Sequence, residues 1–196
     1  MTTSFEPIAV GPLIGWHESA GATFKTIAGW QVAASYPNVT ENRLVDCSHW
    51  AVAEYLADLA SGLASRVGLL PGVGRFKQVG DHVAYQLTDQ RAIVVGPTTA
   101  APGIDVTGGW SAMVIDGPNS LDVLAHVTGL DLRASRFPIG GCKQGPVFGV
   151  SSLVARSGDR RYELHVCPDS FEFLWEAILD AGQAYDLRPA GIEQDQ

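Results

Sequence analysis

Two short segments decide the fold of this chain, Gly149-Val-Ser-Ser-Leu-Val-Ala-Arg156 and Arg161-Tyr-Glu-Leu-His-Val166. Apolar and polar residues alternate in both, and the turn-forming residues Ser157-Gly158-Asp159 lie between them. Alternation with a period of two is typical of half-buried strands, and a short turn brings consecutive strands side by side. The pattern therefore predicts an antiparallel hairpin.

An amphipathic helix is expected directly after this hairpin, over Phe171-Glu-Phe-Leu-Trp-Glu-Ala-Ile-Leu-Asp-Ala-Gly182. Its apolar residues recur at helical spacing. Asp169 or Ser170 can cap the start, and Gly182 can close the end. A hairpin followed by a helix of this kind places the helix on one face of the sheet.

Further elements are predicted upstream from the same two periodicities. We expect strands at Ala92–Val95 and Ala112–Ile115, and helices over residues 50–67 and 119–127. Between residues 110 and 181 the order is then strand, helix, strand, strand, helix. This order predicts an α+β fold in which helices cover one face of a mainly antiparallel sheet.

Length and composition limit the possible architectures. A chain of 196 residues that is 46% hydrophobic buries a core without help from a metal or a disulfide. We expect a single domain over residues 1–196, built from two closely packed halves of about 1–105 and 106–196. The three cysteines are widely spaced, which favours neither a disulfide framework nor a zinc site.

Charge and hydropathy exclude two classes of partner. The net charge is −8 and the basic residues are scattered, whereas a nucleic-acid surface needs a concentrated basic stripe. The sequence contains no apolar run of about 18 residues, the length that spans a bilayer. The first residues do not combine a basic segment with an apolar one. We therefore expect a cytoplasmic protein that binds neither nucleic acid nor membrane.

The order of motifs along the whole chain resembles the aminomethyltransferase (T-protein) of the glycine cleavage system. That family opens with a phenylalanine, an Ala-Gly-Trp, a Tyr-Pro and an Asp-x-Ser-His, matched here by Phe24, Ala28-Gly-Trp30, Tyr36-Pro37 and Asp46-Cys-Ser-His49. The family also has a strand bearing Tyr-Glu between a hairpin and a Trp-containing helix, matched here by Tyr162-Glu163. The resemblance implies the folate-binding fold of that family.

The resemblance also implies a tetrahydrofolate site. Glu163 would accept hydrogen bonds from the amino group and ring N–H of a pterin. Tyr85 corresponds to a tyrosine that lines the folate site of the family, Trp50 is placed to stack on the planar ring, and Tyr162 adjoins the carboxylate. No catalytic residue and no metal ligand are assigned.

Each of these residues also has a purely structural interpretation. Glu163 and Tyr162 are adjacent in a strand and should point to opposite faces, so Glu163 faces inward if Tyr162 faces solvent. Otherwise Glu163 is solvent-facing and pairs with Arg161 or Arg156. Tyr85 and Trp50 are alternatively core residues. The sequence leaves both interpretations open.

Two departures from the family pattern bear on function. The catalytic aspartate of the family follows the strand equivalent to Ala92–Val95, but this chain has Gly96-Pro-Thr-Thr-Ala-Ala-Pro-Gly103 there, and the next carboxylate is Asp105. The family continues from the equivalent of Leu187–Ile192 into a helix and a C-terminal barrel, which we expect this chain to lack. The arginine that neutralises the glutamate tail of folate is part of that missing helix.

With these departures the chain looks like the small gamma subunit of heterotetrameric sarcosine oxidase. The resemblance implies an accessory subunit of an N-methyl amino acid oxidase or dehydrogenase, with flavin held by partner subunits, because this chain has no Gly-x-Gly-x-x-Gly motif at a helix start. One alternative is a stand-alone tetrahydrofolate-dependent one-carbon transferase or demethylase that uses Glu163 and Asp105. A second alternative is an aminomethyltransferase fold recruited to unrelated chemistry.

Overall fold

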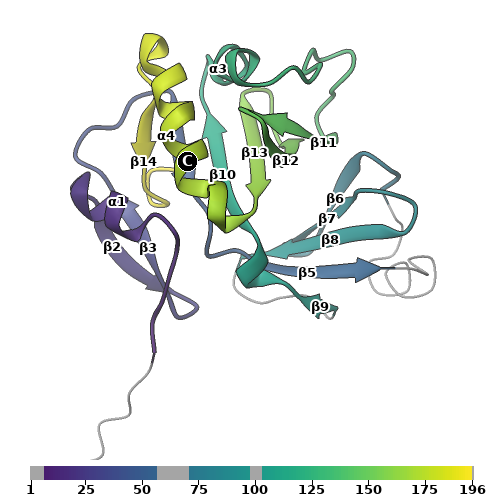
Figure 1. Ribbon diagram of the computed structural model, residues 1–196, viewed down its shortest axis with the longest axis horizontal. Coiled ribbons are helices and arrows are strands. Elements are labelled where there is room, and N and C mark those ends of the chain that lie inside the picture. The colour runs from purple at the N-terminus through teal and green to yellow at the C-terminus, as the bar shows by residue number, and fades with distance from the viewer. Residues whose placement is uncertain (1–6, 57–70, 98–102, 196) are drawn as a thin grey trace, which may run out of the picture.

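The structure, a computed structural model, describes residues 7–56, 71–97 and 103–195. Strands dominate and form three sheets (Figure 1). Sheet A has the order β1 (Ala9–Val10), β3 (Trp30–Ser35), β2 (Thr23–Ile27). Sheet B has the order β11 (Cys142–Val147), β12 (Val150–Arg156), β13 (Arg161–Val166), β10 (Ser111–Asp116), β4 (Arg43–Asp46), β14 (Arg188–Ala190). Sheet C has the order β6 (Arg75–Val79), β7 (His82–Gln86), β8 (Arg91–Gly96), β5 (Ala51–Leu56), β9 (Ile104–Asp105).

The predicted hairpin is confirmed as β12 and β13. The two strands pair antiparallel from Ser152↔Val166 to Arg156↔Tyr162, and β13 also pairs antiparallel with β10. The strands expected at Ala92–Val95 and Ala112–Ile115 are β8 and β10. In sheets B and C every pairing is antiparallel except that of β14 with β4. The α+β class predicted from the sequence is confirmed.

Helices α3 (Ser120–Val127) and α4 (Phe171–Ala181) lie over the strands of sheet B (Figure 1), and the short helix α1 (Ile14–Ser19) lies near sheet A. The 3-10 turns are Thr107–Gly109, Pro168–Ser170 and Gln183–Tyr185. The main core forms where α3 and α4 meet sheet B, because their apolar stripes pack on the inward side chains of β10 and β13. Gly182 closes α4 as expected. A Cβ there would lie 2.5 Å from the side chain of Leu187, so only glycine fits.

The helix predicted over residues 50–67 is wrong for its first part. Ala51–Leu56 form strand β5, which pairs with β8 over six positions and with β9 on its other side. Backbone hydrogen bonds to two neighbours and the burial of Val52 and Ala53 outweigh a local helical pattern, because propensity is a weak prior against tertiary pairing. The remainder of this prediction, residues 57–67, lies outside the described residues.

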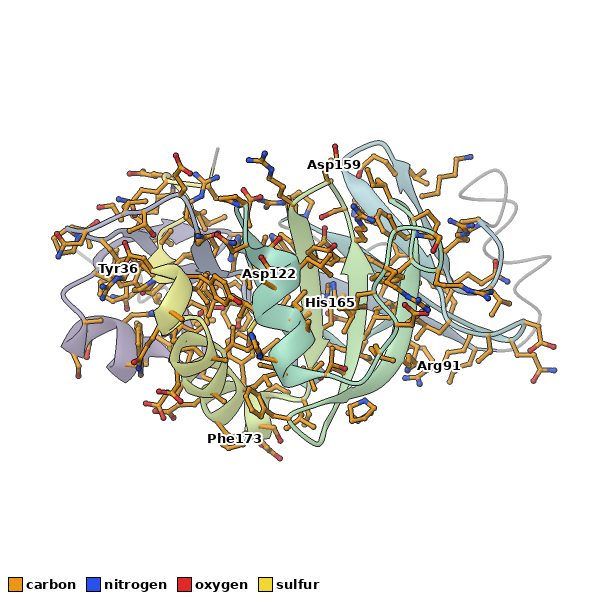
Figure 2. All side chains as sticks on the ribbon, turned by 90° about the horizontal axis from the view of Figure 1, so that it is seen from above. Tyr36, Arg91, Asp122, Asp159, His165 and Phe173 are labelled. Carbon is orange, nitrogen blue, oxygen red and sulfur yellow. The ribbon has the colours of Figure 1, made fainter. Side chains whose placement is uncertain are left out.

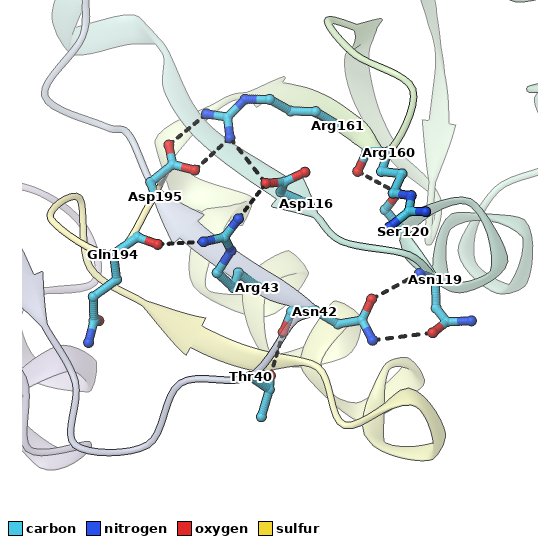
Figure 3. Close-up of polar contacts among 10 residues, drawn as sticks. All are labelled: Thr40, Asn42, Arg43, Asp116, Asn119, Ser120, Arg160, Arg161, Gln194 and Asp195. Atoms are coloured by element: carbon cyan, nitrogen blue, oxygen red, sulfur yellow. Dashed lines mark hydrogen bonds and ion pairs between the residues drawn. The ribbon is translucent and has the colours of Figure 1, made fainter.

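The end of the described chain is bound into sheets A and B. The backbone N–H groups of Ile192 and Glu193 donate to the carbonyl oxygens of Ala33 and Ala34 in β3. Asp195 accepts two hydrogen bonds from the guanidinium of Arg161, at 2.5 and 2.6 Å, in the polar network drawn in Figure 3. This segment therefore joins β3 to β13.

The two predicted halves share one sheet, because β4 comes from the first 105 residues yet lies between β10 and β14. A single domain over the whole chain stays our prediction. In the described ranges no helix is long and apolar enough to cross a membrane.

Candidate functional site

Glu163 lies in the middle of β13, on the face of sheet B turned away from α3 and α4. Its side chain is nearly enclosed, since the residue is only 8% exposed. Neither arginine suggested by the alternative interpretation pairs with it. Arg161 binds Asp195, and Arg156 donates to backbone carbonyl oxygens, among them that of Phe137. The solvent-facing interpretation of Glu163 is therefore wrong.

Tyr85 provides the partner of Glu163 from across the molecule. The Tyr85 hydroxyl, on β7 of sheet C, donates a hydrogen bond to Oε2 of Glu163 on sheet B. Burial and the nearby negative charge of Glu163 raise the pKa of Tyr85 well above its usual value, so the phenol keeps its proton. The pair therefore connects the two sheets through a buried carboxylate and a neutral phenol.

His165 completes the cluster, and the sequence reasoning missed it. It lies two residues after Glu163 on β13 and therefore on the same face, fully buried; Figure 2 labels it within the strands of sheet B. Its Nε2 is 3.6 Å from Oε2 of Glu163. Neither of its ring nitrogens has a hydrogen-bond partner in the described part of the chain. The signal available in the sequence was the period-two spacing from Glu163.

The pKa of Glu163 reflects opposing effects of these neighbours. Burial raises it, but the interaction with His165 and the hydrogen bond from Tyr85 lower it more, so the pKa lies below its ordinary value of 4.5. Glu163 is therefore an ionised acceptor at neutral pH. A buried carboxylate of this kind suits a ligand that offers N–H groups.

Of the two other predicted site residues, one lies in the cluster and the other does not. Trp50 joins the cluster as a half-buried wall, with its ring centroid 6.2 Å from that of His165. Tyr162 does not join it. Tyr162 is fully buried on the opposite face of β13, where its ring stacks on Phe137 at 6.4 Å. The condition that Tyr162 faces solvent is not met, because both faces of this central strand are covered.

The segment after β8 supplies no acid to this cluster in the described residues. Residues 98–102 are outside the described ranges, and the first carboxylate beyond them, that of Asp105, accepts hydrogen bonds from the backbone N–H and hydroxyl of Thr107. These bonds lower the pKa of Asp105, so it is ionised. Among the described residues no group of three or more His, Cys, Asp or Glu side chains is arranged to hold a metal ion.

This architecture is similar to that of solved structures. The glycine cleavage system aminomethyltransferase T from Bartonella henselae superposes with a TM-score of 0.73 at 19% identity, over 95% of this chain and 60% of that one. A chain of the heterotetrameric sarcosine oxidase from Corynebacterium sp. U-96 superposes with a TM-score of 0.70 at 15% identity, over 89% of this chain and 95% of that one. The fold is therefore the aminomethyltransferase fold.

Sequence comparison places the chain within a family. Residues 77–195 match the GCVT N-terminal domain, and the chain belongs to this family. The aminomethyltransferases of Saccharopolyspora erythraea and Streptomyces avermitilis are 25% and 29% identical to it, over 92% and 90% of this chain. The chain spans 60% and 58% of the length of these two relatives.

Proposed function

We propose that this chain is an accessory, gamma-type subunit of a heteromeric sarcosine oxidase or of a related N-methyl amino acid oxidase or dehydrogenase. The observation that carries the proposal is the structural similarity to a chain of the heterotetrameric sarcosine oxidase, which extends over 89% of this chain. The absence of a carboxylate between Gly96 and Gly103 agrees with a non-catalytic role. Flavin would be bound by the partner subunits.

An exposed apolar edge of sheet C supports a subunit contact. Leu56 at the end of β5 and Ile104 in the two-residue edge strand β9 are 55% and 56% exposed. Ile104 pairs with Glu54, and Leu56 follows Glu54 by two residues, so both apolar side chains lie on one face of the sheet. Exposed apolar side chains grouped at the edge of a sheet are typical of an interaction surface.

Tetrahydrofolate is the ligand that we propose for the cluster of Glu163, Tyr85, His165 and Trp50. The ionised carboxylate of Glu163 would accept N–H groups of the pterin, and the half-buried Trp50 would contact its ring. The Tyr85 hydroxyl already donates to Oε2 of Glu163, so the pterin would bond Oε1 or displace the phenol.

Purification from the native host tests the subunit role. We expect an affinity-tagged chain to bring down flavin-containing subunits, identified by mass spectrometry and by the visible absorbance of flavin. Ile104→Asp should lower the yield of these partners, because it puts a charge on the apolar edge of sheet C. Phe148→Asp is the matched control, since Phe148 is an exposed apolar residue in the turn between β11 and β12. A chain that purifies alone and monomeric would contradict the proposal.

A stand-alone tetrahydrofolate-dependent one-carbon transferase or demethylase is the second candidate. The names of the curated relatives, aminomethyltransferases at 25% and 29% identity, favour it. It requires turnover by the purified chain without any partner. If the chain shows neither turnover nor partners, recruitment of the fold to unrelated chemistry becomes the best explanation.

A further inference from the structure

A pocket of about 260 Å³ lies where the N-terminal segment, sheet A and the turn after β9 meet. Its walls include two tryptophans and three hydroxyl residues, Trp30, Trp110, Ser48, Thr107 and Ser111. Glu163, Tyr85 and His165 do not line it, so the pocket is separate from the folate candidate site. The proposed subunit role does not use it.

The hydroxyl of Ser48 ends a buried chain of polar side chains. Ser48 Oγ donates to Oδ1 of Asp46 at 2.6 Å, and Oδ2 of Asp46 is 2.9 Å from Nε2 of His17. Nδ1 of His17 is 2.5 Å from the hydroxyl of Tyr36. Burial and the charge of Asp46 raise the pKa of Tyr36, so its hydroxyl keeps its proton.

The hydroxyl of Thr107, on another wall of the pocket, is also bonded to a carboxylate. Its hydroxyl donates to Oδ1 of Asp105 at 2.7 Å and accepts from the backbone N–H of Val52 at 3.0 Å. Asp105 is ionised, as described above. A hydroxyl has one proton, so Ser48 and Thr107, having given theirs to carboxylates, can offer a ligand only lone pairs.

The remaining features of the pocket also favour a positively charged ligand. Both tryptophans are half-buried, and the face of an indole ring attracts cations. None of the described residues that line the pocket is basic. The net charge of the chain, −8, also favours the approach of a cation.

We propose that this pocket binds a small N-methylated ammonium ion. The N–H of such an ion would donate to Ser48 Oγ, its methyl groups would contact Trp30 and Trp110, and the charges of Asp46 and Asp105 would stabilise it. Aromatic walls with nearby acceptors are how proteins recognise methylated ammonium groups. The volume suits a compact ion rather than a drug-sized molecule.

Titration with trimethylammonium tests the charge requirement. It is protonated at neutral pH, and tert-butanol is a neutral compound of similar size that also has three methyl groups on its central atom. In NMR spectra we expect trimethylammonium to shift the indole N–H signals of Trp30 and Trp110, with a Kd of about 1 mM, while the other three indole signals stay in place. Binding of tert-butanol with equal affinity, or no shift of these two signals by trimethylammonium, would overturn the proposal.

Two small substitutions test the location. Gly11 lines the pocket, and a Cβ there would lie 3.5 Å from Cβ of Ser48 and 3.7 Å from Oδ2 of Asp46, which are ordinary contacts. Gly11→Ala should therefore fold normally while placing a methyl group beside the carboxylate, and we expect about a tenfold weaker affinity, as for Ser48→Ala. Gly15→Ala in the exposed part of α1 has nothing within 4 Å of the new methyl group and serves as the control. If Gly11→Ala binds trimethylammonium as well as Gly15→Ala does, the site is not here.

Discussion

At the scale of single residues, the hydrogen bond between Tyr85 and Glu163 connects sheets B and C. Tyr85→Phe removes the hydroxyl and leaves Oε2 of a buried carboxylate without its donor. Such a group costs about 1–3 kcal/mol when it loses its partner, so we expect the free energy of unfolding in urea to fall by that amount. Tyr185→Phe is the control, because Tyr185 is partly exposed and its hydroxyl makes one long contact, 3.3 Å from Nε2 of His126. Equal losses in the two variants would show that the Glu163 bond contributes nothing specific.

The lowered pKa of Glu163 predicts a pH dependence of stability. Because this pKa is lower in the folded than in the unfolded protein, the folded state resists protonation, and the stabilisation is complete above the ordinary value of 4.5 and lost as pH falls through the folded pKa. We therefore expect the difference in unfolding free energy between the native chain and Glu163→Gln to be largest near neutral pH and to shrink below about pH 4.5. A difference independent of pH would mean that the carboxylate charge does not matter.

Folate affinity depends on the same side chain. Glu163→Gln retains the shape and one acceptor but points a donor at the donors of a pterin. A hydrogen bond to a charged group contributes about 1.5–3 kcal/mol, so we expect tetrahydrofolate to bind about 10- to 100-fold more weakly to this variant, measured by calorimetry on the chain with its partner subunits. Equal affinity of both proteins would exclude Glu163 from the site. If neither protein binds tetrahydrofolate, this chain does not bind the ligand of its family.

Of the four residues in the cluster around Glu163, three were predictable from the sequence and His165 was not. The motif order led to Glu163, Tyr85 and Trp50 because a related fold brings those positions together. His165 carries no motif, and only its spacing from Glu163 places it on the same face of the strand. Tyr162 was misplaced because a central strand covered on both faces has no solvent side.

At the scale of secondary-structure elements, α4 shows how sharply burial changes between neighbours. Leu174 is fully buried, whereas Phe173 is 56% exposed. We expect Leu174→Ala to lower the unfolding free energy by about 2–5 kcal/mol, because it leaves a cavity in the main core. Phe173→Ala should change it by about 0.5 kcal/mol or less. A large loss from Phe173→Ala would show that this side chain is covered in solution.

The elements that were predicted correctly have an apolar periodicity, and the face that this periodicity defines is the one buried in the structure. Helix α4 and the hairpin of β12 and β13 have one face to bury, and the structure buries it. The helix predicted where β5 forms was wrong because distant pairing, not a local pattern, determines the structure there. Ala51–Leu56 pair on both sides with β8 and β9, and those partners are up to about 50 residues away in the sequence, beyond the reach of a local pattern.

At the scale of the whole molecule, the central question is whether the chain catalyses anything by itself. We expect the purified chain not to form methylenetetrahydrofolate or methyltetrahydrofolate from an aminomethyl or methylamine donor at ordinary enzymatic rates. A positioned general acid or base contributes about 10²–10⁴-fold to rate, and residues 96–103 offer no carboxylate for this role. Product analysis by mass spectrometry, with a glycine cleavage aminomethyltransferase as the positive control, decides the matter. Product formation at a rate near that of the control would favour the stand-alone enzyme.

The segment from Gly191 to Asp195 has a consequence for biosynthesis. The carbonyl oxygens of Ala33 and Ala34 accept hydrogen bonds from residues 192 and 193, and Arg161 binds Asp195, so these contacts form only after the segment has been made. The three strands of sheet A are translated early, but the hydrogen bonds that join β3 to this segment form late. A nascent chain stalled on the ribosome before residue 191 would lack these contacts, and we expect β3 to be more accessible to chaperones and to other nascent chains in that state.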